Sequence, residues 1–263
     1  MSYETVEWES RDGVGRITLN RPESLNAWNG QFASEMKELV DHAADPSVRA
    51  VLVRGAGRGF SSGADLKGGG LSLADDDRPD ILHELHDLYH PVLRGIRQLE
   101  KPVVAAVHGP AVGIGLSLAL ACDLILAAES SFMSLAFAGI GLMPDGGSTL
   151  FVPAAVGKAR AFEMALLGER VPAPKALEWG LVNAVHPDDE LLGVADELIA
   201  RLAAGPTRSY AGSKRALNQS LYSGLEEQFN LEAELQHALA RTDDFVEGVG
   251  AFLGKRDPAF RGS

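Results

Sequence analysis

The sequence has one cysteine among its 263 residues, so no disulfide can form within the chain. Cys122 lies in a stretch rich in alanine and leucine. These surroundings predict a small buried hydrophobic residue and argue against a cysteine nucleophile. A chain without cross-links is also typical of a reducing compartment.

Long apolar runs are missing as well. The apolar run at residues 116–122 is far shorter than the roughly 20 residues that a membrane-spanning helix needs. The first residues, MSYETVEWES, contain neither the basic nor the apolar segment of a secretory signal. These absences predict a soluble, cytoplasmic protein without a membrane partner.

Positive charge is scarce, because 24 Lys and Arg residues face 36 Asp and Glu residues and the formal net charge is −12. Nucleic acid and anionic membranes repel such a protein. We therefore predict neither as a partner, and we expect any anionic ligand to meet local positive charge.

The composition itself is that of a globular protein, with 46% hydrophobic and 23% charged residues. Alternating or β-branched runs predict strands at residues 15–20, 50–53, 103–107 and 181–185. Apolar steps of three and four residues predict helices at residues 32–43, 82–99, 149–156, 159–167, 190–203, 209–221 and 225–241. We therefore predict an α/β core over residues 1–200 and a helical C-terminal region over residues 201–263.

Two glycine-rich loops, residues 55–66 and residues 109–117, follow predicted strands. Glycines let the backbone approach a ligand closely, and loop or helix N-terminal N–H groups can bind an oxyanion. The first loop could also be a flexible turn, and the second could serve close packing of helix on strand. The glycines do not have the spacing of a dinucleotide-binding fingerprint.

A third loop, residues 140–148, places the carboxylate of Asp145 among apolar neighbours. Burial would raise the pKa of this carboxyl and suit it to act as a general base. The alternative is that Asp145 is a turn or helix-capping residue.

Together these loops resemble the crotonase, or enoyl-CoA hydratase/isomerase, family, and the resemblance extends over nearly the whole chain. Its markers are residues 20–27, 60–66, 101–109, 119–123 and 251–258. The resemblance implies a spiral of ββα units with a helical trimerisation region, assembled as a homotrimer or homohexamer. It also implies an acyl-CoA substrate, carried as a coenzyme A thioester, with no permanently bound cofactor and no metal.

The resemblance also implies the site residues. The backbone N–H groups of Ala64 and Ile114 form the oxyanion hole, and Asp145 is the catalytic carboxylate. Coenzyme A binding falls on Ser24, Leu25, Ala27, Ala64, Asp65, Leu66 and Lys255. We expect local positive charge for this ligand from Arg21, Lys67 and Lys255.

The sequence departs from typical hydratases, which carry glutamates at the positions of Ser117 and of Ala136 or Phe137. A carboxylate at the position of Asp145 is typical of isomerase-like members, including the ring-opening isomerase of phenylacetate degradation. Two carboxylates divide the work of hydration, whereas a double-bond shift needs one base. We therefore predict an enoyl-CoA isomerase of fatty acid metabolism, in which the Ser117 hydroxyl is left to orient a substrate group. A hydratase and a non-catalytic acyl-CoA-binding homologue are the alternatives.

Three other motifs have weaker support. Residues 59–63 match the G-x-S-x-G elbow of serine hydrolases, but no helical pattern follows at once. His83, His86 and His90 share a predicted helical face, which could suggest a metal site, although each also fits a polar position beside an apolar stripe. The acidic triplet at residues 75–77 lacks the alternate spacing of a calcium loop, which predicts solvated acids.

Overall fold

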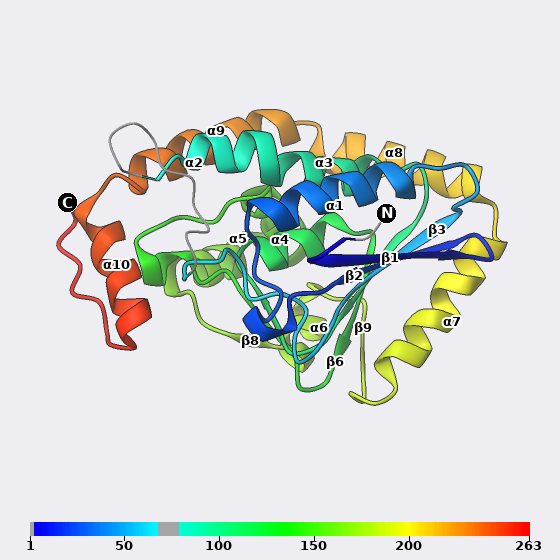
Figure 1. Cartoon of the computed structure of the whole chain (residues 1–263), viewed down its shortest axis with the longest axis horizontal. Helices are drawn as coiled ribbons and strands as arrows, with labels where there is room; N and C mark the ends of the chain where they lie inside the picture. The colour runs from blue at the N-terminus through cyan, green and yellow to red at the C-terminus, as the bar shows by residue number, and fades with distance from the viewer. Residues whose placement is uncertain (1–2, 68–78) are drawn as a thin grey trace.

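The computed structural model describes residues 3–67 and 79–263, and its centre is a six-stranded sheet with the strand order β1-β2-β3-β4-β6-β9 (Figure 1). β1 is antiparallel to β2, and every later pair in this sheet is parallel. The strands of this sheet are β1 (Val6–Arg11), β2 (Val14–Leu19), β3 (Ala50–Gly55), β4 (Val103–Val107), β6 (Leu124–Ala128) and β9 (Ala184–His186). A second sheet is formed by β5 (Pro110–Val112), β7 (Phe132–Ser134) and β8 (Val171–Pro172).

Helices cover both faces of the central sheet (Figure 1). The helices before residue 141 are η1 (Pro22–Ser24), α1 (Gly30–Ala43), α2 (Ile81–His83), the π-helical turn η2 (Glu84–Tyr89), α3 (His90–Gln98), α4 (Ile114–Ala121) and η3 (Phe137–Ile140). The helices after residue 141 are α5 (Ser148–Leu167), α6 (Ala173–Trp179), α7 (Leu191–Ala204), α8 (Thr207–Tyr222), α9 (Leu225–Leu239) and α10 (Asp243–Gly254). None of the helices described is long and apolar enough to cross a membrane.

The parallel strands are apolar on both sides because both faces of the sheet are covered. In β3, Val51 and Val53 belong to the main core with α1, α3 and α4, whereas Leu52 packs with the cluster around α7. In β4, Val103 and Val104 divide between the two cores in the same way. Successive side chains of a strand point to opposite faces, and here both faces are buried. This explains why these strands are short continuous runs of small or β-branched residues.

The structure confirms the expected α/β class and the helical character of the C-terminal region, while the division of the chain at residue 200 stays a prediction. The strand predicted at residues 181–185 begins three residues later. Leu181 and Val182 are buried in a turn, and the side-chain oxygen of Asn183 accepts the Ile125 N–H at 2.7 Å before pairing of β9 with β6 begins. The two helices predicted at residues 149–156 and 159–167 form α5, which has a kink where Gly157 has φ 77°.

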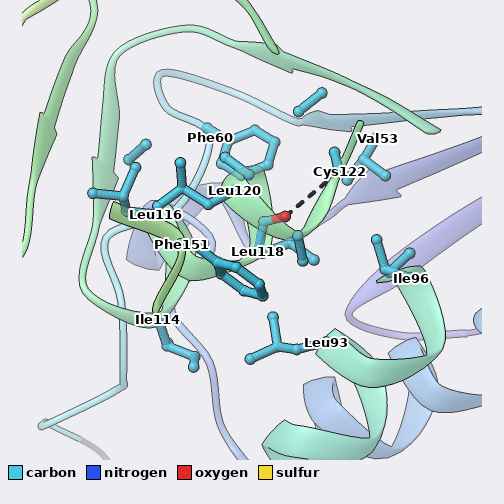
Figure 2. Packing of buried hydrophobic residues seen from close by; sticks show 14 of the residues in the cluster. Val53, Phe60, Leu93, Ile96, Ile114, Leu116, Leu118, Leu120, Cys122 and Phe151 are labelled. Atoms are coloured by element: carbon cyan, nitrogen blue, oxygen red, sulfur yellow. Dashed lines mark hydrogen bonds between the residues drawn. The ribbon is translucent and has the colours of Figure 1, made fainter. Parts of the chain in front are cut away.

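The core around α4 contains the cysteine (Figure 2). All eight residues of α4 are buried, and Figure 2 shows Leu116, Leu118 and Leu120 among side chains from α3, β3 and α5. The Cys122 thiol donates to the Leu118 carbonyl at 3.4 Å, and burial raises its pKa to about 12. The prediction that Cys122 is a buried residue is confirmed.

His90 is a buried histidine at the junction of η2 and α3. Its ring stacks on Phe229 of α9 with the centroids 4.3 Å apart, and neither ring nitrogen has a hydrogen-bond partner among the described residues. Burial, with smaller effects from His86 and Arg94, lowers the pKa of His90 to about 3. The imidazole is therefore neutral at physiological pH.

We expect His90 to make stability depend on pH. The unfolded chain protonates this histidine below about pH 6.5, whereas the folded protein resists protonation down to about pH 3. Its contribution to stability is therefore complete above pH 6.5 and is lost as the pH falls toward 3. Between pH 7.5 and pH 5, His90→Phe should lose about 2 kcal/mol less unfolding free energy than the natural protein. Urea unfolding at both pH values measures this, and an equal loss in both proteins would contradict it.

Candidate active site

Backbone hydrogen bonds join three segments that lie far apart in the sequence. The Trp28 N–H donates to the Gly63 carbonyl at 2.8 Å, and the Ser62 N–H donates to the Leu25 carbonyl at 2.9 Å. On the other side, the Val112 N–H donates to the Ser61 carbonyl at 2.9 Å. The two glycine-rich loops predicted from the sequence therefore lie side by side.

Glycines make this close approach possible. A Cβ on Gly63, where φ is +95°, would lie 3.0 Å from the Val112 carbonyl oxygen. A Cβ on Gly115 would lie 2.6 Å from the Ser61 Cβ, and Gly113 has φ +54° immediately before α4. Larger residues at these positions would force the loops apart or strain the backbone.

Ala64 and Ile114 come from these two loops and line the same cavity, whose volume is about 220 Å³. Ile114 is the first residue of α4, where helix geometry leaves N–H groups without intrahelical partners. Within residues 3–67 and 79–263, the N–H groups of Ala64 and Ile114 donate to no other protein group. Both donors are thus available to a ligand, and the helix dipole at Ile114 favours negative charge.

Asp145 lines this cavity as well, with 7% of its surface exposed. Its Oδ2 accepts a hydrogen bond from Gln236 Nε2 at 2.7 Å, whereas Oδ1 has no partner among the described residues. Burial raises the pKa of this carboxyl to about 7; the Gln236 bond opposes the rise and nearby Glu232 adds to it. The expectation that burial raises this pKa is confirmed, and Asp145 is suited to exchange protons at physiological pH.

Two serine hydroxyls hold the backbone of Asp145. Ser117 Oγ donates to the Asp145 carbonyl oxygen at 2.9 Å, and Ser148 Oγ donates to the same oxygen at 2.7 Å. Ser117 is buried and does not line the cavity. The hypothesis that its hydroxyl orients a substrate group is therefore wrong, because that hydroxyl fixes the loop instead.

Three acidic or amide side chains at this site were not predicted from the sequence patterns. Glu84 of η2 and Gln236 of α9 line the cavity, and Glu232 lies one helical turn before Gln236. Glu232 accepts the Gly147 N–H at 2.7 Å and the Thr149 N–H at 3.1 Å, and burial raises its pKa to about 7. Glu232 and Gln236 lie on the apolar face of α9. A pair of polar residues on an apolar helical face is the sequence signal that could have indicated them.

Only some of the predicted coenzyme A residues lie at the cavity. Ala64 and Leu66 line the cavity, while the segment containing Ser24, Leu25 and Ala27 is hydrogen-bonded beside it. Lys255 is exposed at the end of α10 and does not line the cavity, and Lys67 is exposed as well.

Arg21 does not supply the free positive charge that the sequence suggested. Its guanidinium is 2.9 Å from the Asp65 carboxylate and also donates to the Ala27 carbonyl. The ion pair neutralises Arg21 and ties the segment at residues 21–27 to the first glycine-rich loop.

The weaker motifs that lie within the described residues do not form sites of their own there. Ser61 is buried and its hydroxyl donates to the Asn26 carbonyl at 2.9 Å, so it is not presented as a nucleophile. His83 pairs with Asp87 at 2.8 Å, whereas His90 is buried, and the part of the chain that the structure describes contains no cluster of metal-ligating side chains. The acidic triplet at residues 75–77 lies outside the described residues.

Comparison with known proteins gives a consistent result. Residues 9–263 match the family model described as enoyl-CoA hydratase/isomerase. The chain is 39% identical to 1,2-epoxyphenylacetyl-CoA isomerase of Escherichia coli K12 over 95% of each chain. It is 42% identical, over the full length of both chains, to a Rhodobacter capsulatus protein named "probable enoyl-CoA hydratase". A solved enoyl-CoA hydratase structure from Mycobacterium avium subsp. paratuberculosis K-10 has a TM-score of 0.89 and 43% identity, covering 99% of this chain and 100% of that one.

Proposed function

Because the chain belongs to the enoyl-CoA hydratase/isomerase family, we propose that it is an enoyl-CoA isomerase with Asp145 as its proton-transferring base. One observation carries the proposal. Asp145, with one carboxylate oxygen unpartnered among the described residues, lines the same cavity as Ala64 and Ile114, whose N–H groups are available. A base and a pair of oxyanion donors facing one apolar space are what a thioester enolate requires.

The reaction then follows from the geometry. Asp145 Oδ1 takes a proton from C2 of a 3-enoyl-CoA. The C2–H electron pair forms the C1=C2 bond of a dienolate, the C3=C4 bond stays in place, and the carbonyl electron pair moves to the thioester oxygen. The negative charge develops on the thioester oxygen, where the Ala64 and Ile114 N–H groups stabilise it. Asp145 returns the proton to C4 as the electron pairs shift back, so the product is a 2-enoyl-CoA with no net gain or loss of atoms.

The acids of a typical hydratase are missing where the resemblance places them. Ala136 and Phe137 line the cavity without a carboxylate, and Ser117 is engaged with the Asp145 loop. Relatives named as isomerases support the same choice, including a trans-2-decenoyl-[acyl-carrier-protein] isomerase of Streptococcus mutans at 35% identity over 100% of each chain.

A hydratase is the second candidate, and one specific observation favours it. Glu84 lines the cavity together with Asp145, so two carboxyl groups face the space where an acyl group would bind. Two carboxyl groups could divide the activation of water and the delivery of a proton. A non-catalytic acyl-CoA-binding protein is the third candidate, which measured turnover on enoyl-CoA thioesters would eliminate.

We also propose that coenzyme A binds along the hydrogen-bonded segments at residues 24–27 and 64–66, which form one wall beside the cavity. A trimer or hexamer is proposed from the apolar side chains that the single chain leaves exposed on its later helices. These exposed side chains include Phe162, Leu166, Leu167, Leu231, Leu235, Val246, Phe252 and Leu253. Exposed large apolar side chains, where they gather in a patch, mark protein interfaces.

Asp145→Asn should abolish isomerisation of 3-enoyl-CoA while leaving coenzyme A affinity nearly unchanged, because the amide keeps the size of the carboxyl but cannot accept the proton. In the natural protein, kcat should fall as the pH drops below about 7, where the base becomes protonated. Assays of isomerisation and of 2-enoyl-CoA hydration across a range of pH measure the activity. Titration calorimetry with acyl-CoA measures the affinity. Efficient hydration by the natural protein, or full isomerase activity in the variant, would show that the base is misassigned.

Ile114→Ala should retain appreciable isomerase activity, because the proposed donor is the backbone N–H and not the side chain. Gly113→Pro should be inactive, since proline cannot adopt φ +54° and removes the N–H that donates to the Ser134 carbonyl at 2.9 Å. Loss of one oxyanion donor costs roughly a hundredfold to a thousandfold in rate. Steady-state kinetics, with circular dichroism to verify folding, compare the two variants, and a folded but inactive Ile114→Ala protein would refute this assignment.

If the proposed assembly forms, multi-angle light scattering at micromolar concentration should give the molar mass of three or six chains. Replacing the exposed Leu166 by Glu should weaken the assembly, because a charge would be placed in an apolar interface. A monomer in the natural protein would contradict the proposal.

A further inference from the structure

We propose that Gln236 is a positioning residue that confines the exchangeable proton of Asp145 to Oδ1, so that one carboxylate oxygen both takes the proton and returns it. The kinetic part of this inference rests on the proposed isomerase function. Its structural part concerns Asp145 and α9 alone and can be tested without turnover.

The orientation of the Gln236 amide follows from its two partners. Gln236 Oε1 accepts the Met143 N–H at 3.3 Å, and a backbone N–H can only donate. The other end of the amide, Nε2, must therefore face Asp145, where it lies 2.7 Å from Oδ2. Both bonds are made inside the protein, since only 1% of Gln236 is exposed.

This orientation decides which oxygen can be protonated. An amide NH₂ group donates and does not accept, so a proton on Oδ2 would point at another proton. Oδ2 is thus an acceptor in both protonation states of Asp145. The proton resides on Oδ1, which has no partner among the described residues and belongs to a side chain that lines the cavity.

The same helix fixes the loop that carries Asp145. Glu232, one turn before Gln236, accepts the N–H groups of Gly147 and Thr149, and it is fully buried. α9 therefore holds Asp145 twice, through its side chain and through the backbone that follows it. The carboxyl plane cannot rotate without breaking the bond to Gln236.

The electrostatic surroundings of Asp145 come from several elements. Glu232 faces it from α9, Glu84 and Tyr89 line the cavity from η2, and the nearby Ser117 and Ser148 of α4 and α5 are uncharged. Among the described cavity-lining residues there is no lysine, arginine or histidine. Among the described residues, Gln236 is therefore the group that stabilises the Asp145 carboxylate by hydrogen bonding, and its removal should raise the pKa of Asp145.

The test compares Gln236→Met with Gln228→Met. Methionine has nearly the shape of glutamine but no amide. Gln228 is the matched control, because it lies two turns earlier on α9 and donates to Thr149 Oγ1 at 2.6 Å without reaching Asp145. Both variants lose an amide hydrogen bond to the same part of the molecule.

Gln236→Met should lower kcat about tenfold to a hundredfold with little change in KM, the effect of one hydrogen bond to a charged group. The acid limb of its pH–kcat profile should move to higher pH. With a substrate carrying deuterium at C2, less deuterium should appear at C4 of the product, because the proton can then occupy either oxygen. Gln228→Met should match the natural protein in all three measurements.

Nuclear magnetic resonance of ¹³C-labelled aspartate carboxyls, assigned with Asp145→Asn, measures the Asp145 titration without substrate. A higher pKa in Gln236→Met, but not in Gln228→Met, supports the inference even if the natural protein proves not to be an isomerase. An unchanged titration in Gln236→Met, or equal shifts in both variants, would overturn it.

Discussion

The contact between two backbone loops is the constraint on which the rest of the site depends. Gly63 lies against the Val112 carbonyl, and Gly115 lies against the side chain of Ser61, so neither position has room for a Cβ. This contact places Ala64 and the start of α4 at one cavity. Residues from loops about fifty residues apart can therefore line one cavity because these contacts are made by glycine.

The site also contains buried acids, whose burial is partly offset by hydrogen bonds. Asp145 and Glu232 are both enclosed, and burial raises the pKa of each to about 7. Hydrogen bonds from the Gln236 amide and from the Gly147 and Thr149 N–H groups offset part of that penalty. A carboxyl whose pKa is close to 7 can both accept and release a proton at physiological pH, which a fully solvated aspartate does poorly.

The α/β class and the burial of Asp145 could be predicted because local signals mark them: apolar strands alternating with helical patterns, and one acid in an apolar loop. Ala64 and Ile114 were assigned by the resemblance to the family, because the local signal at these positions is only the two glycine-rich loops. A polar residue on the apolar face of α9 could mark Gln236 as unusual, but its partner could not be identified in this way. Its importance comes from packing of α9 against a loop 91 residues earlier, and nothing local to residue 236 records that partner. The neutralisation of the Arg21 charge could not be predicted for the same reason, because its ion pair with Asp65 forms only in the folded chain.

The long separation between Asp145 and its partners on α9 also has a consequence for the order of folding. The bonds from Gln236 to Asp145 and from Gly147 to Glu232 close loops of 91 and 85 residues, and such long-range contacts form late. A chain emerging from the ribosome can complete the strands and both glycine-rich loops before α9 has been synthesised. The loops that carry the proposed oxyanion donors can thus form first, and the proposed base acquires its fixed geometry only after α9 has been made.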